Sequence, residues 1–477
     1  MLTPAEMGAA DRAAIEGGID GGALMRSAGR AVAREIMRRF TPGRVVVLCG
    51  PGNNGGDGFV IATYLERVGW PVTVALLGRA EALAGDAAQA ARLWRGPIAP
   101  LLPAALDGAR LVVDALFGAG LARPIAGDAA ATLAAVRVPL VAVDLPSGVS
   151  GLTGQVLGTA PQAALTVTFF RPKPGHLLLP GRLLCGETVV ADIGIPEAVL
   201  GPMAPRLFLN TPALWREDLP RRHARDSKYA RGHLTIIGGV TMTGAARLAA
   251  AASRRVGAGL VSIAAGDAPS AAIYRAAEPG VLVTEASIAT LLADPRRNAW
   301  LVGPGLAQGE RTNAVLAALL ASLHASLHAS GRAVVVDADA LSACAGAPER
   351  LAGAALLTPH AGEFARIFGP VGDDKVAAAR RAAAATGAVV LLKGADTVIA
   401  APDGRAAIDA NAPPDLATAG TGDVLAGAAA GLIAQGMNPF KAASAAAWAL
   451  GEAARETGAG TIAEDLPPLL PRALAGL

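Results

Sequence analysis

Two segments that combine glycine with aspartate constrain the fold of this chain more than any other feature. GNNGGDG occupies residues 52–58, and AGTGDVLAG occupies residues 419–427, more than half the chain away. Each follows an apolar stretch typical of a strand and begins a stretch typical of a helix. At such a junction the first N–H groups of a helix and the positive end of its dipole can bind an anion. The two segments therefore predict two nucleotide-handling sites in one chain.

The length of the chain, 477 residues, is more than one hydrophobic core usually supports, so two domains are expected. Hydrophobic residues make up 52% and charged residues only 17% of the chain, with 58 glycines and 33 prolines. This composition excludes a disordered chain and favours α/β domains with buried parallel strands and many turns. Prolines cluster after residue 200, and the basic segment RRHARDSKYARGH follows at 221–233. We therefore expect an N-terminal domain at 1–210 and a C-terminal domain at 211–477.

Several classes of partner are excluded or favoured by the same composition. A net charge of +3 without a concentrated basic surface argues against nucleic acid, and no long apolar span predicts a membrane helix. Cys49, Cys185 and Cys344 are scattered and form no metal-binding spacing, which favours a reducing, cytoplasmic setting. The repeat ASLHASLHAS at 321–330 is interpreted as helical and not as a metal site. An apolar, alanine-rich chain of this kind is expected to form a homo-oligomer.

The N-terminal half repeats one pattern, in which a short apolar strand ends in a polar loop rich in glycine. Unbroken runs of valine and leucine predict strands that are buried on both faces of a parallel sheet. Ligands bind such sheets beyond the carboxyl ends of the strands. The polar residues at these ends are expected to face one crevice: Asn53, Asn54, Asp57, Asp114, Asp144 and Ser147. Their amide, carboxylate and hydroxyl oxygens suit a hard cation such as potassium, although Asn and Asp are also common in helix caps and turns.

The order of these motifs resembles the NAD(P)H-hydrate epimerase family. GNNGGDG, DALFGAG and VDLPSG follow one another along the chain, and FFRPKPGH comes after them. The resemblance implies a Rossmann-like three-layer α/β/α domain in which Asn54, Asp114 and Ser147 hold K⁺. It also implies that the hydrated dinucleotide is contacted by Asn53, Asn54, Gly55, Gly56, Asp57, Gly118, Ala119, Gly120, Leu121, Ala122, Arg123, Pro124 and Asp144.

Epimerisation at the hydrated nicotinamide carbon requires a C–O bond to open and to form again on the other face. A carboxylate can handle the proton in this reaction, and Asp144 is the first candidate. Lys173 is an electrostatic or proton-transfer partner, or else a surface residue. Members of this family often carry Met-Glu-Asn-Ala-Gly in the opening helix, where this chain has MRSAG at 25–29.

In the C-terminal half, the segment GTGD places Asp423 in the first turn of a predicted helix. The preceding N–H groups form an anion hole, and Asp423 can accept a proton from a substrate hydroxyl. A helix cap is the alternative interpretation. Further segments add a strand-end lysine, a His–Glu pair and glycine turns: LLKGADT (391–397), LTPHAGEFARI (357–367), LVGPGL (301–306) and TGAARLAAAASRRVGAGLVSI (243–263).

Together these segments resemble the ADP-dependent NAD(P)H-hydrate dehydratase family, which has a ribokinase-like α/β fold, over residues 225–465. The resemblance implies that the hydrate contacts Ala245, Gly305, His360 and Asp423. It implies that the adenine nucleotide contacts Lys393, Gly394, Ala395, Asp396, Thr397 and Gly422. This chain has Ala307 where glycine is usual in the family, and Ala419 where proline is usual.

The implied function is bifunctional metabolite repair with NADHX and NADPHX, the hydrated forms of NADH and NADPH, as substrates. One domain interconverts their R and S epimers, and the other dehydrates the S epimer. Asp423 deprotonates the hydroxyl of the hydrate, which attacks the terminal phosphate of ADP. The phosphate ester then leaves with push from the ring nitrogen, and AMP remains. Mg²⁺ is expected because the transferring phosphoryl group concentrates negative charge.

Two alternatives of other classes remain at the level of sequence. The N-terminal half could be a non-catalytic binding or assembly module, against which the intact Asp114, Asp144 and Ser147 argue. The C-terminal half could be a small-molecule kinase. A stable phosphorylated product would favour the kinase, and release of free phosphate would favour the dehydratase.

Overall fold

The computed structural model describes residues 1–324 and 332–475, and the chain divides into two compact units, Met1–Leu207 and Phe208–Leu477. Each unit has its own sheet and its own core. Most of the repeat at 321–330 lies outside the described residues.

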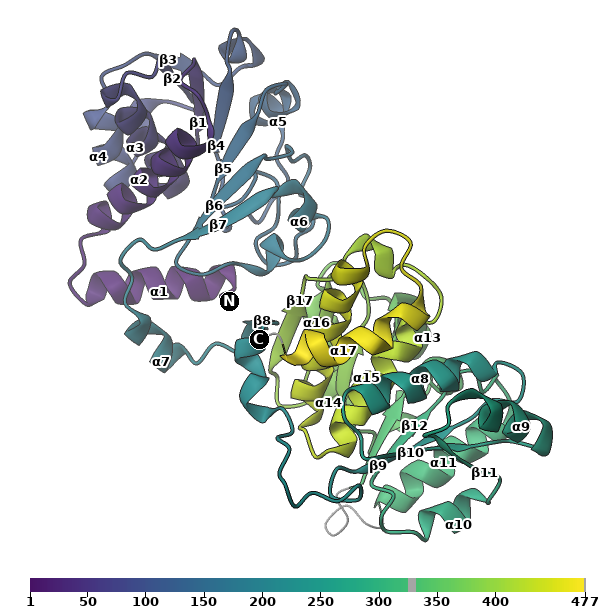
Figure 1. Ribbon diagram of the computed structural model, residues 1–477. Helices are drawn as coiled ribbons and strands as arrows, with labels where there is room; N and C mark the ends of the chain where they lie inside the picture. The colour runs from purple at the N-terminus through teal and green to yellow at the C-terminus, as the bar shows by residue number, and fades with distance from the viewer. Residues whose placement is uncertain (325–331, 476–477) are drawn as a thin grey trace. The chain divides into compact units, whose positions relative to one another are not determined.

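The N-terminal unit is built on a seven-stranded sheet in the order β3-β2-β1-β4-β5-β6-β7 (Figure 1). All neighbouring strands pair in parallel. The strands are β1 (Val45–Cys49), β2 (Val72–Leu76), β3 (Ile98–Pro100), β4 (Leu111–Ala115), β5 (Leu140–Val143), β6 (Leu165–Phe169) and β7 (Glu187–Ala191). Every residue of β1, β4, β5 and β6 is buried, as the unbroken apolar runs predict.

Helices cover both faces of this sheet. One layer contains α2 (Gly21–Arg39), α3 (Asn53–Arg67) and α4 (Gly85–Leu93), and the opposite layer contains α5 (Gly127–Ala134). Alternate residues of β1 belong to the two layers, since Val47 packs with the first and Leu48 with the second. The remaining helices are α1 (Pro4–Glu16), α6 (Gly181–Leu184) and α7 (Leu200–Met203). The predicted Rossmann-like three-layer fold is confirmed.

The C-terminal unit contains a ten-stranded sheet in the order β11-β10-β9-β12-β13-β14-β15-β16-β17-β8. Strands β11 to β15 of this order pair in parallel, and β15, β16 and β17 pair antiparallel. The strands are β8 (Leu207–Leu209), β9 (His233–Ile237), β10 (Leu260–Ala264), β11 (Leu282–Thr284), β12 (Ala299–Val302), β13 (Ala333–Val336), β14 (Leu356–Leu357), β15 (Val389–Leu392), β16 (Thr397–Ala400) and β17 (Ala406–Asp409). The predicted mainly parallel α/β sheet is confirmed, and the antiparallel edge adds to it.

Two layers of helices enclose this second sheet as well. The main core lies under α8 (Thr243–Arg255), α9 (Ala268–Ala277), α15 (Thr421–Ala434), α16 (Pro439–Thr457) and α17 (Leu466–Ala475). The other face is covered by α10 (Ile288–Leu292), α11 (Glu310–His324), α12 (Ala338–Ser342), α13 (Ala361–Phe368) and α14 (Lys375–Thr386). Helix α15 packs closely on α8, because alanine and glycine occupy both surfaces.

Both sheets reverse their strand order beside the first strand of the parallel set. Strand β1 lies between β2 and β4, and β9 lies between β10 and β12. At such a reversal the loops that follow the two central strands separate and leave a crevice for a ligand. The segments GNNGGDG and DALFGAG follow β1 and β4, and the segment LVGPGL overlaps the end of β12. The fold therefore places a predicted motif at each reversal.

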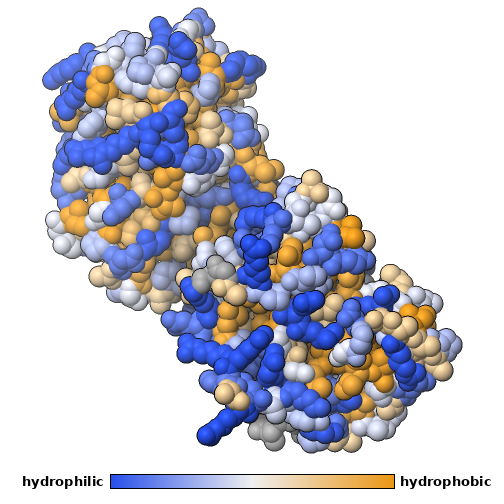
Figure 2. All heavy atoms as spheres, viewed as in Figure 1, coloured by the Kyte–Doolittle hydropathy of each residue, from blue (hydrophilic) through white to orange (hydrophobic). Residues whose placement is uncertain are grey.

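Hydrophilic and hydrophobic residues are interspersed over the face of the molecule that Figure 2 shows. Among the described residues, none of the helices combines the length and the apolar character that crossing a membrane requires.

A buried polar cluster connects the start of the C-terminal unit to its sheet. The Asn210 side-chain amide donates to Asp409 at 2.6 Å and to the carbonyl of Ser444 at 2.9 Å, and it accepts from the Trp215 indole at 3.1 Å. We predict that Asn210→Ala lowers the free energy of unfolding of this unit by about 2–4 kcal/mol, because it leaves buried groups without partners. Urea denaturation measures the change.

Glu217→Ala is the matched control, since Glu217 lies nearby in the chain and is exposed. This variant is expected to stay within about 0.5 kcal/mol of the wild type. Equal stability of the Asn210 and Glu217 variants would show that the cluster contributes nothing to the fold.

Candidate active sites

Most of the segment GNNGGDG is helical, although its glycines suggest a loop. Helix α3 begins at Asn53, so residues 53–57 already lie in its first turns. A Cβ atom on Gly55 would lie 1.9 Å from the carbonyl oxygen of Gly50. Glycine is therefore required for the helix to start this close to the end of β1.

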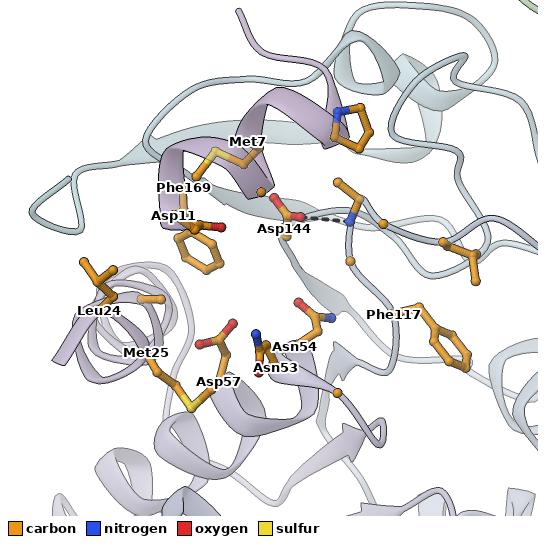
Figure 3. Close-up of a pocket in the computed structure, with 18 of the residues that line it drawn as sticks. Met7, Asp11, Leu24, Met25, Asn53, Asn54, Asp57, Phe117, Asp144 and Phe169 are labelled. Carbon is orange, nitrogen blue, oxygen red and sulfur yellow. Dashed lines mark hydrogen bonds between the residues drawn. The ribbon is translucent and has the colours of Figure 1, made fainter. Parts of the chain in front are cut away.

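A cavity of about 740 Å³ opens at the reversal between β1 and β4 (Figure 3). Most of the predicted epimerase residues line it, namely Asn53, Asn54, Asp57, Gly118, Ala119, Gly120, Leu121, Ala122, Arg123, Asp144 and Lys173. Gly55 and Gly56 are buried behind this lining, and Pro124 is exposed outside it. The structure therefore brings together side chains from the three predicted strand ends.

Helices α1 and α2 supply a wall of the cavity that the sequence did not predict. Met7 and Asp11 of α1, and Leu24 and Met25 of α2, face its interior (Figure 3). Met25 is the first residue of the segment MRSAG, whereas Arg26 turns outward and pairs with Asp20 at 3.0 Å. The sequence signal for this wall was the family segment at 25–29 in the opening helix, which does not reveal what the helix covers.

Asp144 lies at the centre of the hydrogen-bond network in this site. It follows β5 with a backbone φ of 67°, a conformation that a residue other than glycine keeps only where its surroundings impose it. Oδ1 of Asp144 accepts hydrogen bonds from Lys173 Nζ at 2.8 Å and from Thr168 Oγ1 at 2.8 Å. Oδ2 accepts from the backbone N–H of Ala119 at 2.9 Å.

Lys173 is only 1% exposed, so it is not a surface residue. Burial opposes the ionisation of Asp144, but the charge of Lys173, with weaker help from His176 and hydrogen bonds, lowers the pKa of Asp144 to about 2. Burial lowers the pKa of His176 to about 4, and the Lys173 charge adds to this effect. The backbone N–H of Lys173 lies 3.0 Å from Nδ1 of His176, and Nε2 of His176 lies 2.7 Å from the carbonyl of Asp144. A neutral imidazole that donates from Nε2 satisfies both contacts.

Of the predicted K⁺ ligands, Asn54 lines the cavity, whereas Asp114 and Ser147 are completely buried and do not line it. Asp114 is completely buried, and it accepts from the backbone N–H of Ser147 at 2.7 Å and from the Ser147 hydroxyl at 2.6 Å. Burial raises the pKa of Asp114 to about 6, although these hydrogen bonds oppose the increase. The amide nitrogen assigned at Asn54 is buried without a partner. Rotation of the amide group by 180° places its oxygen at that position instead.

At the second candidate site, α15 begins at Thr421, after Gly420 at a backbone φ of 89°. Gly422 therefore belongs to the first helical turn and does not precede it, and Asp423 lies in that turn, as predicted. Position 422 approaches Lys393 closely, since a Cβ atom there would lie 3.5 Å from Nζ. The helix start and the strand-end lysine thus come together across the sequence.

Lys393 is surrounded by acidic groups. Its Nζ lies 2.9 Å from Oδ1 of Asp337 and 3.9 Å from Oε2 of Glu363. Burial disfavours the charge of Lys393, but the carboxylates outweigh burial and raise its pKa. Burial followed by the charge of Asp337 raises the pKa of Asp423 to about 6, while Lys393 acts in the opposite direction.

Asp337 and Asp339, which follow β13 in the segment RAVVVDADAL, were not among the predicted site residues. A signal for Asp337 was available, since it directly follows an apolar strand, as Asp144 does. Asp339 accepts from the backbone N–H of Ala307 at 2.9 Å and so connects two strand ends. Ala307 adopts a backbone φ of 62°, which explains why glycine suits this position. Ala419, at the other departure from the family pattern, is exposed.

The other predicted dehydratase residues occupy the same edge of the sheet. A Cβ atom on Gly305 would lie 3.3 Å from that of Ala245, so these two residues are neighbours. His360 caps α13, because its Nδ1 accepts from the backbone N–H groups of Gly362 and Glu363 at 2.9 and 3.2 Å. Residues 393–397 form a turn. In it the Thr397 hydroxyl accepts a hydrogen bond from the backbone N–H of Gly394 and donates one to the carbonyl of the same residue.

Lys375 holds the same turn from α14. Its Nζ donates to Oδ1 of Asp396 at 2.6 Å and to the carbonyl of Asp396 at 2.9 Å.

Among the described residues, no group of three or more His, Cys, Asp and Glu side chains is arranged to hold a metal ion.

Comparison with known proteins matches both halves of the chain. The model of the NAD(P)H-hydrate dehydratase family matches residues 234–475, and that of the YjeF-related protein N-terminus matches residues 21–175. A bifunctional NAD(P)H-hydrate repair enzyme of Moorella thermoacetica is 38% identical, and the match covers 100% of this chain and 97% of that protein. The enzyme of the same description from Pyrobaculum aerophilum is 38% identical over 99% of this chain and 98% of its own length.

Among solved structures, an ADP/ATP-dependent NAD(P)H-hydrate dehydratase from Bacillus subtilis, co-crystallised with ATP and Mg²⁺, is 26% identical. It covers 56% of this chain and 98% of its own length, with a TM-score of 0.46. The full-length relatives and the two family models confirm the resemblance that the motifs indicated. The chain belongs to the family of bifunctional NAD(P)H-hydrate repair enzymes.

Proposed function

We propose that this protein repairs hydrated NAD(P)H in two steps at two separate sites. The N-terminal unit interconverts the R and S epimers of NADHX and NADPHX. The C-terminal unit dehydrates the S epimer at the expense of ADP and releases AMP and phosphate. The observation that carries this proposal is the full-length match to bifunctional repair enzymes. Its physical support is the cavity that most of the predicted epimerase residues line, together with the meeting of Asp423, Lys393 and Gly422 in the second unit.

In the epimerase site, we propose that the hydrated ring binds in the 740 Å³ cavity, beside the ion pair of Asp144 and Lys173. The residues of the α3 start and the loop 118–124 contact the dinucleotide. Asp144 fixes this loop, because its carboxylate accepts from the N–H of Ala119 (Figure 3).

The residues assigned to K⁺ fit that ion. Asp114 is a fully buried carboxylate without an ion-pair partner among the described residues, and such a charge needs compensation. Ser147 and Asn54 add neutral oxygen ligands of the kind that hard cations prefer. We propose that Asn54, Asp114 and Ser147 would hold K⁺, which would supply a fixed positive charge at this site.

In the dehydratase site, we propose that Asp423 accepts the proton of the hydrate hydroxyl as this hydroxyl attacks the terminal phosphate of ADP. Its pKa, raised to about 6, leaves Asp423 mainly ionised near neutral pH and basic enough to accept the proton. Ala245, Gly305 and His360 contact the hydrate. Lys393 and the turn 394–397 contact the nucleotide, with the N–H groups at the start of α15 directed to its phosphates.

We also propose that Mg²⁺ acts with ADP in this site. Mg²⁺ is commonly held by substrate phosphates, by water and by only one or two carboxylates. The residues present fit this mode, since Asp337, directly after β13, and Asp339, in α12, both act on the charge of Asp423 without forming a complete protein cage. The ion neutralises charge on the phosphoryl group during transfer.

The substrates are metabolites of the cell interior, and we therefore propose a cytoplasmic location.

We also propose that the protein forms a homo-oligomer. Light scattering coupled to gel filtration measures the assembly, and a mass equal to one chain would exclude it.

We predict that two substitutions separate the two activities. Asp423→Asn abolishes nucleotide-dependent recovery of dihydronicotinamide absorbance, because the group that accepts the proton is lost. Asp144→Asn leaves dehydration of the S epimer intact, and recovery stalls when only the R epimer remains. The assay follows a mixture of both epimers with K⁺, Mg²⁺ and either ADP or ATP. Absence of nucleotide-dependent recovery in the wild type would contradict the repair function, and a stable phosphorylated product would indicate a kinase.

A second prediction concerns the pH dependence of the dehydratase. Asp423 must be ionised to accept a proton, so kcat/KM should decrease as the pH falls below about 6. Asp337→Asn should move this decrease to lower pH, because the Asp337 charge raises the pKa of Asp423. Glu349→Gln, which changes an exposed carboxylate, should leave the profile in place. A profile that is identical in the Asp337 variant would refute the coupling.

A third prediction concerns K⁺ removal. Replacing K⁺ by tetramethylammonium should slow epimerisation at least ~10-fold, since this ion is too large for the site and cannot accept oxygen ligands closely. Asp114→Asn should raise the K⁺ concentration needed for half-maximal rate. Dehydration of the S epimer with Mg²⁺ and ADP serves as the control and should persist. Epimerisation at an unchanged rate without K⁺ would exclude the proposed ion.

A further inference from the structure

Three carboxyl groups that line the epimerase cavity, those of Asp11, Asp57 and Asp86, have no side-chain hydrogen bond to any described residue. Asp57 and Asp11 are the two that face each other across its interior in Figure 3. Asp57 comes from α3 and Asp11 from α1 (Figure 3). Asp57 is only 8% exposed, and a polar group buried to this extent normally has a partner. A carboxyl group that faces a cavity without a protein partner is available to bind a ligand there.

In contrast to Asp57 and Asp11, Asp144 has hydrogen-bond partners on both of its carboxyl oxygens. Its Oδ1 already accepts from Lys173 and Thr168, and its Oδ2 accepts from Ala119. Protonation of Asp144 would break this network and leave the ammonium group of Lys173 buried without its counter-ion, at 1% exposure. Asp144 is thus suited to hold charge and position the loop at 118–124, and it is poorly suited to exchange protons during turnover.

We infer that Asp57 is the proton donor of the epimerisation and that Asp11 accepts the proton in the return step. This inference rests on the epimerase function proposed above. It assigns to α1, a helix outside the sheet, a catalytic side chain that the sequence motifs do not contain.

The reaction balances with these two groups and the substrate alone. Asp57 gives its proton to the hydroxyl oxygen, and the C–O bond breaks with its electron pair on the oxygen, which leaves as water. The lone pair of the ring nitrogen forms a C=N bond, so the ring becomes a cation. Water then attacks the opposite face of the same carbon, the C=N pair returns to nitrogen, and Asp11 takes the proton of the attacking water. Transfer of a proton from Asp11 to Asp57, through solvent, restores the starting state.

The electrostatic environment supports this division of roles. Burial raises the pKa of Asp57 well above its usual value, and the negative charges of Asp144 and Asp11 add to the increase. Burial also raises the pKa of Asp11, while Lys173 and Arg12 lower it and Asp144 raises it. Both carboxyl groups therefore hold a proton at higher pH than an exposed aspartate does, which suits groups that exchange protons with a substrate. Asp86 and Arg123 are the other charged groups that line the cavity.

The test uses the full-length protein and purified R epimer, with ADP, Mg²⁺ and K⁺. After subtraction of the spontaneous rate, we expect Asp57→Asn to slow the catalysed recovery from the R epimer at least ~100-fold relative to the wild type, as removal of an acid catalyst usually does. Asp11→Asn should slow it as well. Recovery from the purified S epimer should keep its wild-type rate in both variants. Asp128→Asn is the matched control, because Asp128 lies in the first turn of α5 and is exposed.

The outcomes separate the inference from the proposed function. If the wild type does not convert the R epimer, the epimerase function itself is wrong. If the wild type converts it and both Asp57→Asn and Asp11→Asn do so at the wild-type rate, the inference is wrong. Asp144 is then again the candidate for proton transfer. Circular dichroism and thermal unfolding confirm that each variant is folded. Should Asp57→Asn fail to fold, Asp11→Asn decides the test, since α1 lies outside the sheet.

Discussion

In both units, parallel pairing of strands that are buried on both faces gathers the carboxyl ends of those strands along one edge of the sheet. Each strand end must then connect to a helix on one side or the other, and the connections separate where the strand order reverses. The rest of the molecule depends on this constraint. Gly55 allows α3 to start against the end of β1, and Gly420 allows α15 to start beside Lys393. The topology of each sheet therefore determines where its proposed site lies, and the side chains at the strand ends determine its chemistry.

The two units solve the same electrostatic problem in the same way. Each collects carboxylates at a strand edge that is largely shielded from water, where unpaired charge is costly. Each neutralises one of them with a lysine from another strand end, Lys173 with Asp144 and Lys393 with Asp337. In each unit a further carboxyl group is left with a raised pKa, Asp57 in the first and Asp423 in the second. A fixed ion pair beside a carboxyl group that can exchange a proton is therefore the shared design.

The limits of the sequence analysis follow from the range of the interactions concerned. Strand ends such as Asp114 and Asp144 could be predicted because burial and strand periodicity are local in sequence. Asp337 could have been predicted by the same rule and was overlooked. The wall formed by Asp11 and Met25 could not, because the segment at 25–29 marked a family position without showing what its helix covers, and nothing in the sequence marked Asp11. The burial of Lys173 was likewise undecidable from sequence, since a lysine is usually exposed and only its contact with Asp144 explains its position.

By itself the sequence determined the α/β class of both halves, the family, and the order of the polar strand ends, because these follow from local periodicity and from motif order. Only the tertiary structure decided which carboxyl groups are neutralised and which remain free in a cavity. That distinction depends on distances between residues far apart in the chain, such as the 2.8 Å between Lys173 and Asp144. The unpartnered Asp57 and Asp11 became visible only when three strand ends and an outlying helix were seen around the same cavity.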